Sequence, residues 1–279
     1  MKQLIRETRV KRSLLYLLFA LLPAAAAAEP AEAPSTITLA TLEWPPYAGS
    51  QLPEQGINGA VIRAAYQAMG YRVLIRVVPW QRAVEAARFN PQVAGYFPEY
   101  DSPARREAFI FSDPIGSSPL GLAERVRERS HWQQLAELAR QRLGVVRGYV
   151  NTAELDDRIA SGRQNSDEAQ DDAQNLLKLD RRHIDLAVID RNVFDYLLQN
   201  NPTLRTARGN LTMNPRLLEE KQLYVGFKRG EEGRKLADIL NQGLRRIDAK
   251  AIVRRYLQTH DNDGPVERKQ AAAAKKPAG

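Results

Sequence analysis

Hydrophobic positions along the chain follow two periods in turn, and this alternation predicts strands and helices in succession from Thr36 onward. In the first half we expect strands at 36–42, 71–78, 93–97 and 109–111, and helices at 59–69 and 80–88. In the second half we expect helices at 132–139, 152–159, 175–179, 193–198, 236–247 and 249–257, strands at 143–146, 184–189 and 222–227, and a polar loop at 161–173. Strands alternating with helices in this order predict an α/β protein with largely parallel sheets.

The N-terminus has the order of segments that is typical of a secretory signal peptide. Five basic residues precede an apolar run from Leu14 to Leu22, and Ala26–Ala28 offers a small-residue cleavage site before Glu29. The apolar stretch is shorter than the about 20 residues that a membrane span needs. We therefore expect residues 1–28 to be a cleaved signal peptide and the protein to be exported to the periplasm of a Gram-negative bacterium.

Charge and cysteine content narrow the possible functions further. The chain carries a formal charge of +8, which falls to +4 without residues 1–28, and its basic residues are mixed with acidic ones. A nucleic-acid partner is not expected, because such proteins concentrate basic residues in a stripe or patch. The chain has no cysteine, which excludes disulfides, cysteine-ligated metals and the lipid-anchoring cysteine of bacterial lipoproteins.

Several segments, in this order and spacing, resemble one known family. They read ATLEWPPY, ARREAFIFSDPI, LGVVRGYV, HIDLAVIDRNVFDYLL and IDAKAIVRRYL, and the resemblance covers roughly residues 36–258. The chain is similar to the type II periplasmic solute-binding proteins of polar amino-acid ABC transporters (extracellular solute-binding protein family 3).

This resemblance implies an α/β fold of two lobes joined by two crossover hinge strands, which close around a ligand. Lobe 1 would comprise residues 36–120 and 215–260, lobe 2 residues 121–214, and residues 261–279 would be a disordered tail. The crossover strands would lie near Leu120–Arg125 and Leu223–Phe227. The implied partners of this expected monomer are a small amino-acid-like ligand and an inner-membrane ABC permease, with no cofactor.

The resemblance also implies residues for the two ends of an amino acid. Arg105 occupies the place of the arginine that binds the carboxylate, with Arg106 as the less favoured choice, and a guanidinium can bind a carboxylate through two parallel hydrogen bonds. Asp190 occupies the place of the acid that binds the ammonium group, although an aspartate there can equally cap the following helix. The remaining candidates for the pocket are Trp44, Tyr47, Trp80, Phe97, Tyr100, Arg147, Gly148 and Tyr149.

Three places depart from the family pattern. The bulky run Tyr96–Tyr100 replaces small hydroxyl residues, and Tyr149 replaces a threonine. The family's Gly-x-x-Asp before the strand at 93–97 is also missing, with Asn90–Val93 in its place. These changes would shrink the pocket, add stacking for a planar ligand, or indicate a protein that does not bind an ordinary amino acid.

Two other functions stay open beside transport. The first is an enzyme like the periplasmic cyclohexadienyl dehydratases, for which Glu43 and Glu99 are the candidate acids, while His131, His183 and His260 are too scattered for a catalytic or metal cluster. The second is the presentation of the ligand to a membrane sensor. We expect binding without catalysis, because no hydrolase, metalloprotease or phosphate-loop motif is present.

Overall fold

The computed structural model describes residues 35–260. The predicted signal peptide and the predicted tail lie outside these residues. Within them, no helix combines the length and the apolar character that crossing a membrane requires.

The first group of elements is a parallel sheet with helices between its strands. Strands β1 (Thr36–Thr41), β2 (Arg72–Val77) and β3 (Gly95–Glu99) lie in the order β2-β1-β3, linked by α2 (Ile57–Gln67) and α3 (Trp80–Phe89). Helix α2 buries Val61, Ile62, Ala65 and Tyr66, because this spacing places them on one helical face. The predicted strands and helices of this part are confirmed, with ends shifted by a few residues.

The second group repeats this arrangement. Strands β6 (Leu143–Val146), β7 (Ser166–Ala169) and β8 (Leu186–Asp190) are parallel, and α5 (Ala153–Ala160), α6 (Asp172–Asp180) and α7 (Arg191–Asn200) alternate with them. The three helices begin after Thr152, Asp171 and Asp190, whose side chains each accept a backbone N–H of the first turn.

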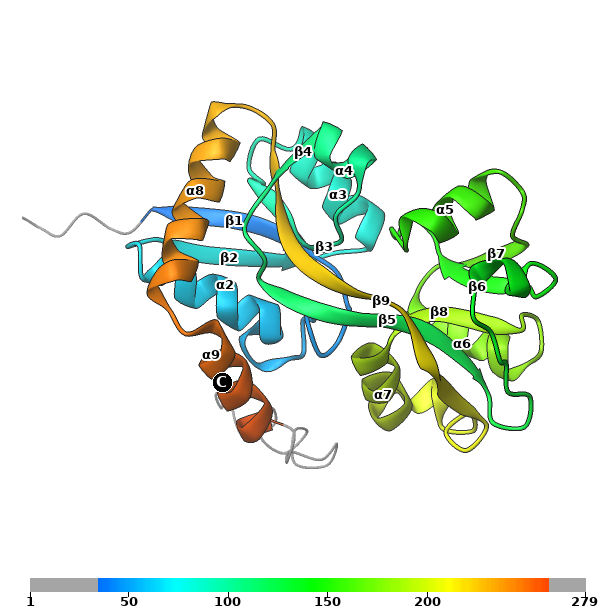
Figure 1. The fold of residues 1–279 in the computed structure, drawn as a ribbon. Helices are drawn as coiled ribbons and strands as arrows, with labels where there is room; N and C mark the ends of the chain where they lie inside the picture. Colours follow the sequence, from blue (N-terminus) through cyan, green and yellow to red (C-terminus); the bar gives the residue numbers. More distant parts are fainter. Residues whose placement is uncertain (1–34, 261–279) are drawn as a thin grey trace, which may run out of the picture. The chain divides into compact units, whose positions relative to one another are not determined.

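Two long antiparallel strands join the groups. Strands β5 (Gly116–Arg125) and β9 (Leu211–Lys228) pair with each other, and the sheet order is β2-β1-β3-β9-β5-β8-β6-β7. The short β4 (Phe109–Phe111) pairs with the end of β9. In Figure 1 both long strands run from one group of elements to the other. At Gly226 on β9 a Cβ would lie 2.6 Å from the ring of Tyr96, so glycine allows this close packing.

The last two helices pack on the first group. Helix α8 (Glu231–Arg246) and α9 (Ala249–His260) both contact α2, as Figure 1 shows. The Tyr66 hydroxyl on α2 donates to the Leu236 carbonyl on α8 at 3.0 Å. The Tyr256 hydroxyl on α9 donates to the Pro53 carbonyl, in the 3₁₀ turn η1 (Pro53–Gln55), at 3.1 Å.

Two local predictions are wrong, one predicted strand is too short, and one short helix was missed. The expected helix at 132–139 is only a 3₁₀ turn, η2 (Leu135–Leu138), and the expected loop at 161–173 contains β7. Strand β7 is polar because it lies at the edge of the sheet with one face in solvent. The predicted strand at 222–227 is only the end of β9, whose middle carries alternating polar residues, and the short helix α4 (Pro103–Ala108) gave no pattern. A third 3₁₀ turn, η3 (Pro202–Leu204), follows α7.

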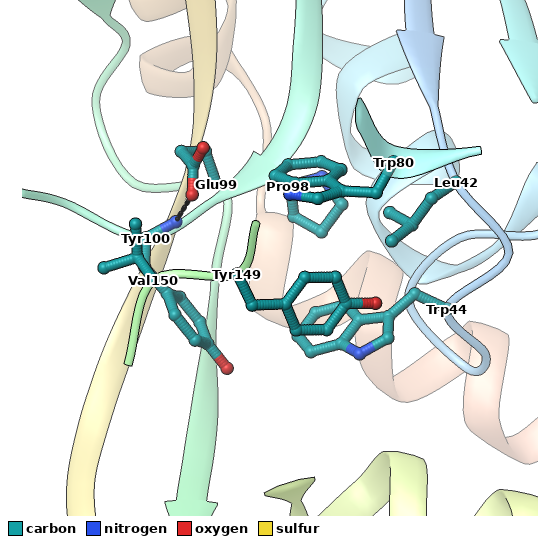
Figure 2. A pocket seen from close by; sticks show the side chains of 8 residues that line it. All are labelled: Leu42, Trp44, Trp80, Pro98, Glu99, Tyr100, Tyr149 and Val150. Carbon is teal, nitrogen blue, oxygen red and sulfur yellow. Dashed lines mark hydrogen bonds between the residues drawn. The ribbon is translucent and has the colours of Figure 1, made fainter. Parts of the chain in front are cut away.

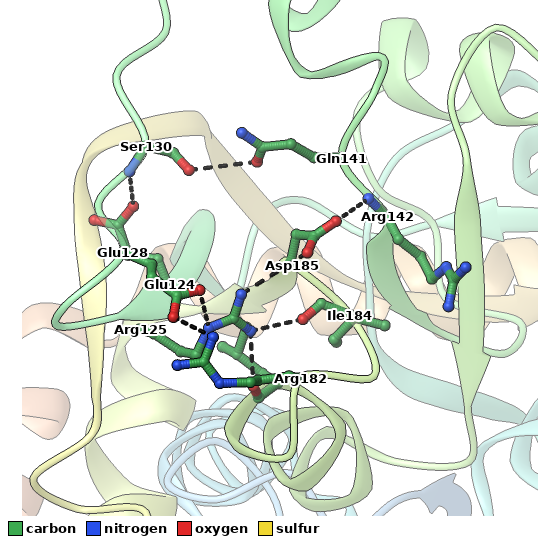
Figure 3. Close-up of polar contacts among 10 residues, drawn as sticks. Glu124, Arg125, Glu128, Ser130, Gln141, Arg142, Arg182, Ile184 and Asp185 are labelled. Atoms are coloured by element: carbon green, nitrogen blue, oxygen red, sulfur yellow. Dashed lines mark hydrogen bonds and ion pairs between the residues drawn. The ribbon is translucent and has the colours of Figure 1, made fainter.

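A network of paired charges anchors β5 in the second group. Arg125, at the end of β5, bonds Glu128 at 2.8 Å and the Ile184 carbonyl (Figure 3). It also bonds the Leu179 carbonyl. The fully buried Glu124 carboxylate accepts from the Arg129 guanidinium and the Ser130 backbone. We call these residues the Arg125 cluster: Glu124, Arg125, Glu128, Arg129, Arg182 and Asp185. Each carboxylate in it has a cationic partner.

Candidate ligand-binding cleft

A cavity lies where the two groups of elements meet. The first group contributes Leu42, Trp44, Trp80, Pro98, Glu99 and Tyr100, and the second contributes Tyr149 and Val150, which follow β6. Figure 2 shows these side chains around one cavity. About 280 Å³ is free of protein atoms when the opening to solvent is included. The cavity is therefore small for a ligand pocket, since such pockets usually measure about 300–1,000 Å³.

Aromatic rings fill most of the space around the cavity. Trp44 stacks on Tyr47 with ring centres 4.7 Å apart and meets Tyr100 edge-on at 6.1 Å. Trp80 packs against Tyr96 at 5.5 Å and against Tyr149 at 5.9 Å. These contacts are at the distances at which aromatic pairs attract each other. The Trp80–Tyr149 contact joins the two groups of elements across the cavity.

Glu99, at the end of β3, is a buried acid with several partners. It accepts from the Tyr96 hydroxyl at 2.8 Å and from the Tyr100 backbone at 2.9 Å, and it pairs with Nε of Arg105 at 2.9 Å. Burial raises the pKa of Glu99 to about 7, against the opposing effects of Arg105 and the two hydrogen bonds. The arginine that was predicted to bind a carboxylate thus already pairs with one from its own chain.

The backbone of Gly148 receives two side chains from the other group. Its carbonyl oxygen accepts Nε1 of Trp80 at 3.0 Å and Nη2 of Arg105 at 2.9 Å. Gly148 has a φ of 78°, in the left-handed region that favours glycine. This conformation places the Gly148 carbonyl where side chains of α3 and α4 reach it.

Asp190 ends β8 and caps α7. The two roles predicted for it, binding an ammonium group and capping the helix, thus concern the same carboxylate. Its Oδ1 accepts from the Val193 backbone at 2.9 Å, and its Oδ2 accepts from the hydroxyls of Ser118 and, at 3.1 Å, Tyr47. The Tyr47 hydroxyl in turn accepts from the Asn192 side chain at 2.7 Å. Burial raises the pKa of Asp190 to about 6, although these hydrogen bonds favour the ionised form.

Asp172, the first residue of α6, is a buried acid that the sequence analysis did not select. The Tyr149 hydroxyl donates to it over a long 3.4 Å. Burial, with Asp171 and Asp190 as like charges, raises the pKa of Asp172 to about 7. The buried indole N–H of Trp44 favours the ionised carboxylate but is not in hydrogen-bonding geometry with it. In the sequence, Asp171 and Asp172 look like the capped start of an ordinary helix. The position of Asp172 near the cleft is therefore visible only in the fold.

The structure places other candidates away from the cavity. Phe97 is fully buried in the core, and Arg147 is exposed and pairs with Glu168 at 2.8 Å. Arg106 is exposed and pairs with Asp101, and Glu43 accepts from the Ser50 backbone. His131 and His183 are exposed outside the cavity. Trp44, Trp80, Tyr100 and Tyr149 line the cavity directly, while Tyr47, Arg105, Gly148 and Asp190 contact its lining residues.

Two further residues of the cleft were missed. Ser118, on β5, bonds both Asp190 and the Tyr100 hydroxyl, and Lys221, on β9, lies 5.5 Å from the centre of the Tyr100 ring. Both belong to the long joining strands, where a local sequence pattern predicts pairing but not which side chains face the cleft. Within residues 35–260, no group of acidic or histidine side chains could hold a metal ion.

Comparisons with known proteins identify the fold. No family model matches the sequence, and no curated protein does. Among solved structures, a histidine kinase sensor domain similar to periplasmic binding proteins is 20% identical, with a TM-score of 0.68, and the match covers 81% of this chain and 97% of that one. An amino acid ABC transporter substrate-binding protein from Streptococcus pneumoniae, bound to L-arginine, is 12% identical, with a TM-score of 0.65 and coverage of 81% and 94%.

A third solved structure has the same architecture. An ancestral amino acid-binding protein, a precursor of cyclohexadienyl dehydratase, is 14% identical, with a TM-score of 0.62 and coverage of 81% of this chain and 94% of that one. The described chain therefore has the two-lobed periplasmic-binding-protein fold, as predicted. At these identities the similarity shows the fold alone.

Proposed function

We propose that this protein is a periplasmic solute-binding protein of family 3 that captures a small polar ligand, an amino acid or a related compound, by hinge closure for an ABC permease. We assign β1–β4, α2–α4, α8 and α9 to lobe 1 and β6–β8 with α5–α7 to lobe 2, with β5 and β9 as the hinge. One observation carries this proposal: Tyr47, Trp80 and Arg105 of lobe 1 meet Gly148 and Asp190 of lobe 2 beside one cavity.

The first test is a ligand screen. A thermal-shift series with amino acids, amines and small organic acids should return at least one stabilising solute, because a ligand at about 100 times its Kd adds about 2.7 kcal/mol. Asp190→Asn should weaken the binding of that solute at least about tenfold, as expected when a hydrogen-bonded charge is lost. Asp195→Asn, exposed on helix α7, which Asp190 caps, is the matched control. If no solute binds, the proposed function is wrong.

Signalling is the second candidate, and the sensor-domain neighbour favours it. A ligand presented to a membrane receptor would need the same cleft, so ligand binding alone does not distinguish the two functions. Deletion of the gene should abolish uptake of the identified solute if the partner is a permease. It should abolish only the transcriptional response to that solute if the partner is a sensor.

Catalysis is the third candidate, because one structural neighbour is the precursor of an enzyme. We favour binding, because the buried acid Glu99 that would serve as a general acid is held by Arg105, Tyr96 and the Tyr100 backbone. A bound solute recovered chemically unchanged after prolonged incubation supports binding. Conversion of the solute by the purified protein, and its loss in Glu99→Gln, would establish an enzyme instead.

A further inference from the structure

The charges around the cleft do not balance in the way that an amino acid would require. Three acids are buried there: Glu99 is 3%, Asp172 6% and Asp190 1% exposed. Arg105 pairs with Glu99, and Lys221 also favours its ionised form. Across residues 35–260, no cationic side chain forms an ion pair with Asp172 or Asp190. An ionised carboxylate is costly to bury without a cation. These two acids are therefore suited to bind a cationic ligand.

Arg105 is correspondingly poor at receiving a carboxylate. Its Nε bonds Glu99 and its Nη2 bonds the Gly148 carbonyl, so the Nε/Nη2 edge, one of the two edges of a guanidinium that can form two parallel hydrogen bonds, is already used. A ligand carboxylate that reached the guanidinium would also approach the Glu99 carboxylate, and two like charges repel. The arginine thus neutralises a charge of its own chain, and its Nε/Nη2 edge is not free for a ligand.

The aromatic side chains beside Asp172 also favour a cationic ligand. Trp44 and Tyr149 line the cavity together (Figure 2), and the Tyr149 hydroxyl bonds Asp172. Aromatic faces attract organic cations, and this attraction is strongest where water is excluded. Because the free volume is small, a ligand of several atoms has to separate Tyr149 from Trp80, which hinge opening allows.

We propose that the cleft selects a small organic cation without a carboxylate group, an amine or a guanidinium compound, held by Asp172 and Asp190 between aromatic rings. This inference rests on the proposed solute-binding function and narrows its ligand. Asp172 and Asp190 belong to the second lobe, whereas Trp44 belongs to the first, so the cation would contact both lobes when they close.

Matched pairs of compounds test the proposal directly. Agmatine and arginine, tyramine and tyrosine, and putrescine and ornithine each differ only by the α-carboxylate. In calorimetry with the purified protein above about pH 7.5, at least one amine should bind at least about tenfold more tightly than its parent amino acid. Equal or tighter binding of the amino acids overturns the cation proposal and leaves solute binding intact. If no amine binds but another solute in the screen does, the cation proposal alone fails, and if nothing binds, both fail.

Two isosteric variants locate the origin of this preference. Glu99→Gln should free Arg105 and shift the preference toward the amino acid at least about tenfold, whereas Asp172→Asn should weaken amine binding by about the same factor. Glu107→Gln, exposed on α4, and Asp195→Asn, exposed on α7, are the matched controls and should change neither value. Wild-type affinities in Asp172→Asn overturn the proposal, even if Glu99→Gln does not fold.

Discussion

The Arg125 cluster and the cleft both bury carboxylates, but they treat the charge differently. In the Arg125 cluster Glu124 is fully buried and pairs with Arg129, and Glu128 pairs with both Arg125 and Arg182. In the cleft Asp172 and Asp190 are also buried, yet their partners in the described chain are hydroxyl and N–H groups.

The difference shows which charges serve the fold and which are left for a ligand. A buried carboxylate with a cationic partner is satisfied within the chain, and removal of either partner costs stability. A buried carboxylate without one reduces stability at the pH at which it is ionised. The cleft contains both kinds, because Glu99 resembles the Arg125 cluster and Asp172 does not.

The largest expected effect is the loss of the cation that balances Glu99. Arg105→Ala should lower the free energy of unfolding by about 3 kcal/mol near pH 8, since Glu99 stays buried without its partner. The loss should shrink near pH 5.5, where Glu99 takes up a proton because its pKa, already raised to about 7, rises further without Arg105. Denaturant unfolding at the two pH values measures both effects.

Arg106→Ala is the control for this measurement, because its ion pair with Asp101 is exposed and its loss should cost less than about 0.5 kcal/mol. A cost in Arg105→Ala that does not depend on pH would contradict the role assigned to Glu99.

The next effect has the opposite sign. Because the pKa of Asp172 is about 7 in the folded protein and lower in the unfolded chain, the folded state keeps a proton that the unfolded state loses. Stability therefore falls as the pH rises from about 4 to 7. Asp172→Asn should remove this part of the decline and raise the unfolding free energy by on the order of 2 kcal/mol at pH 8, with little change near pH 4. Equal stability at pH 8 would show that Asp172 already has a cationic partner.

Ligand affinity should follow the same titration. Asp171 and Asp190 face Asp172 as like charges, Tyr149 donates to it, and a bound cation opposes the like charges and lowers its pKa. The affinity for whichever of the three amines binds should therefore rise about tenfold between about pH 6 and 8, with release of protons near pH 6. Calorimetry in buffers of different ionisation enthalpy measures this release. Affinity that falls over this range would point to a ligand that needs a protonated acid.

The smallest expected effect is the contribution to stability of the hydrogen bond between Trp80 and the Gly148 carbonyl, apart from the burial of the indole. Trp80→Phe should cost about 1 kcal/mol more than Trp132→Phe, because Trp80 donates to the Gly148 carbonyl whereas Nε1 of Trp132 has no hydrogen-bond partner in the described chain. The two indoles are similarly buried, at 9% and 8% exposed. Thermal unfolding compares them, and equal losses would mean that the Gly148 contact contributes nothing.

Much of the fold could be predicted from the sequence because most elements bury one regular face. The spacing of Val61, Ile62, Ala65 and Tyr66 indicates α2 without any tertiary information. Strand β7 and the middle of β9 could not be predicted, since their polar residues are typical of loops and only pairing with a neighbouring strand fixes them.

The candidate cleft was predictable for residues whose role is local and not for those whose role depends on distant partners. Trp44 and Tyr149 stand next to strand ends, where α/β proteins place ligand sites, and both line the cavity. The pairing of Arg105 with Glu99 was not predicted, because the five intervening residues of turn and helix decide whether these two side chains meet. Asp172 lies in a helix start that looks ordinary in sequence.

The position of β9 in the sheet also constrains the order in which the chain can fold. Strand β3 ends at Glu99, yet the neighbour that covers its open edge is the C-terminal part of β9, up to Lys228. During synthesis, β3 can pair with β9 only after more than a hundred further residues have been made. The parallel pairs among β6, β7 and β8, in contrast, join strands that are close in the sequence. Contacts between distant segments form slowly. The second lobe should therefore acquire protection from hydrogen exchange before β1–β3 do, and the arrival of β9 should complete both lobes.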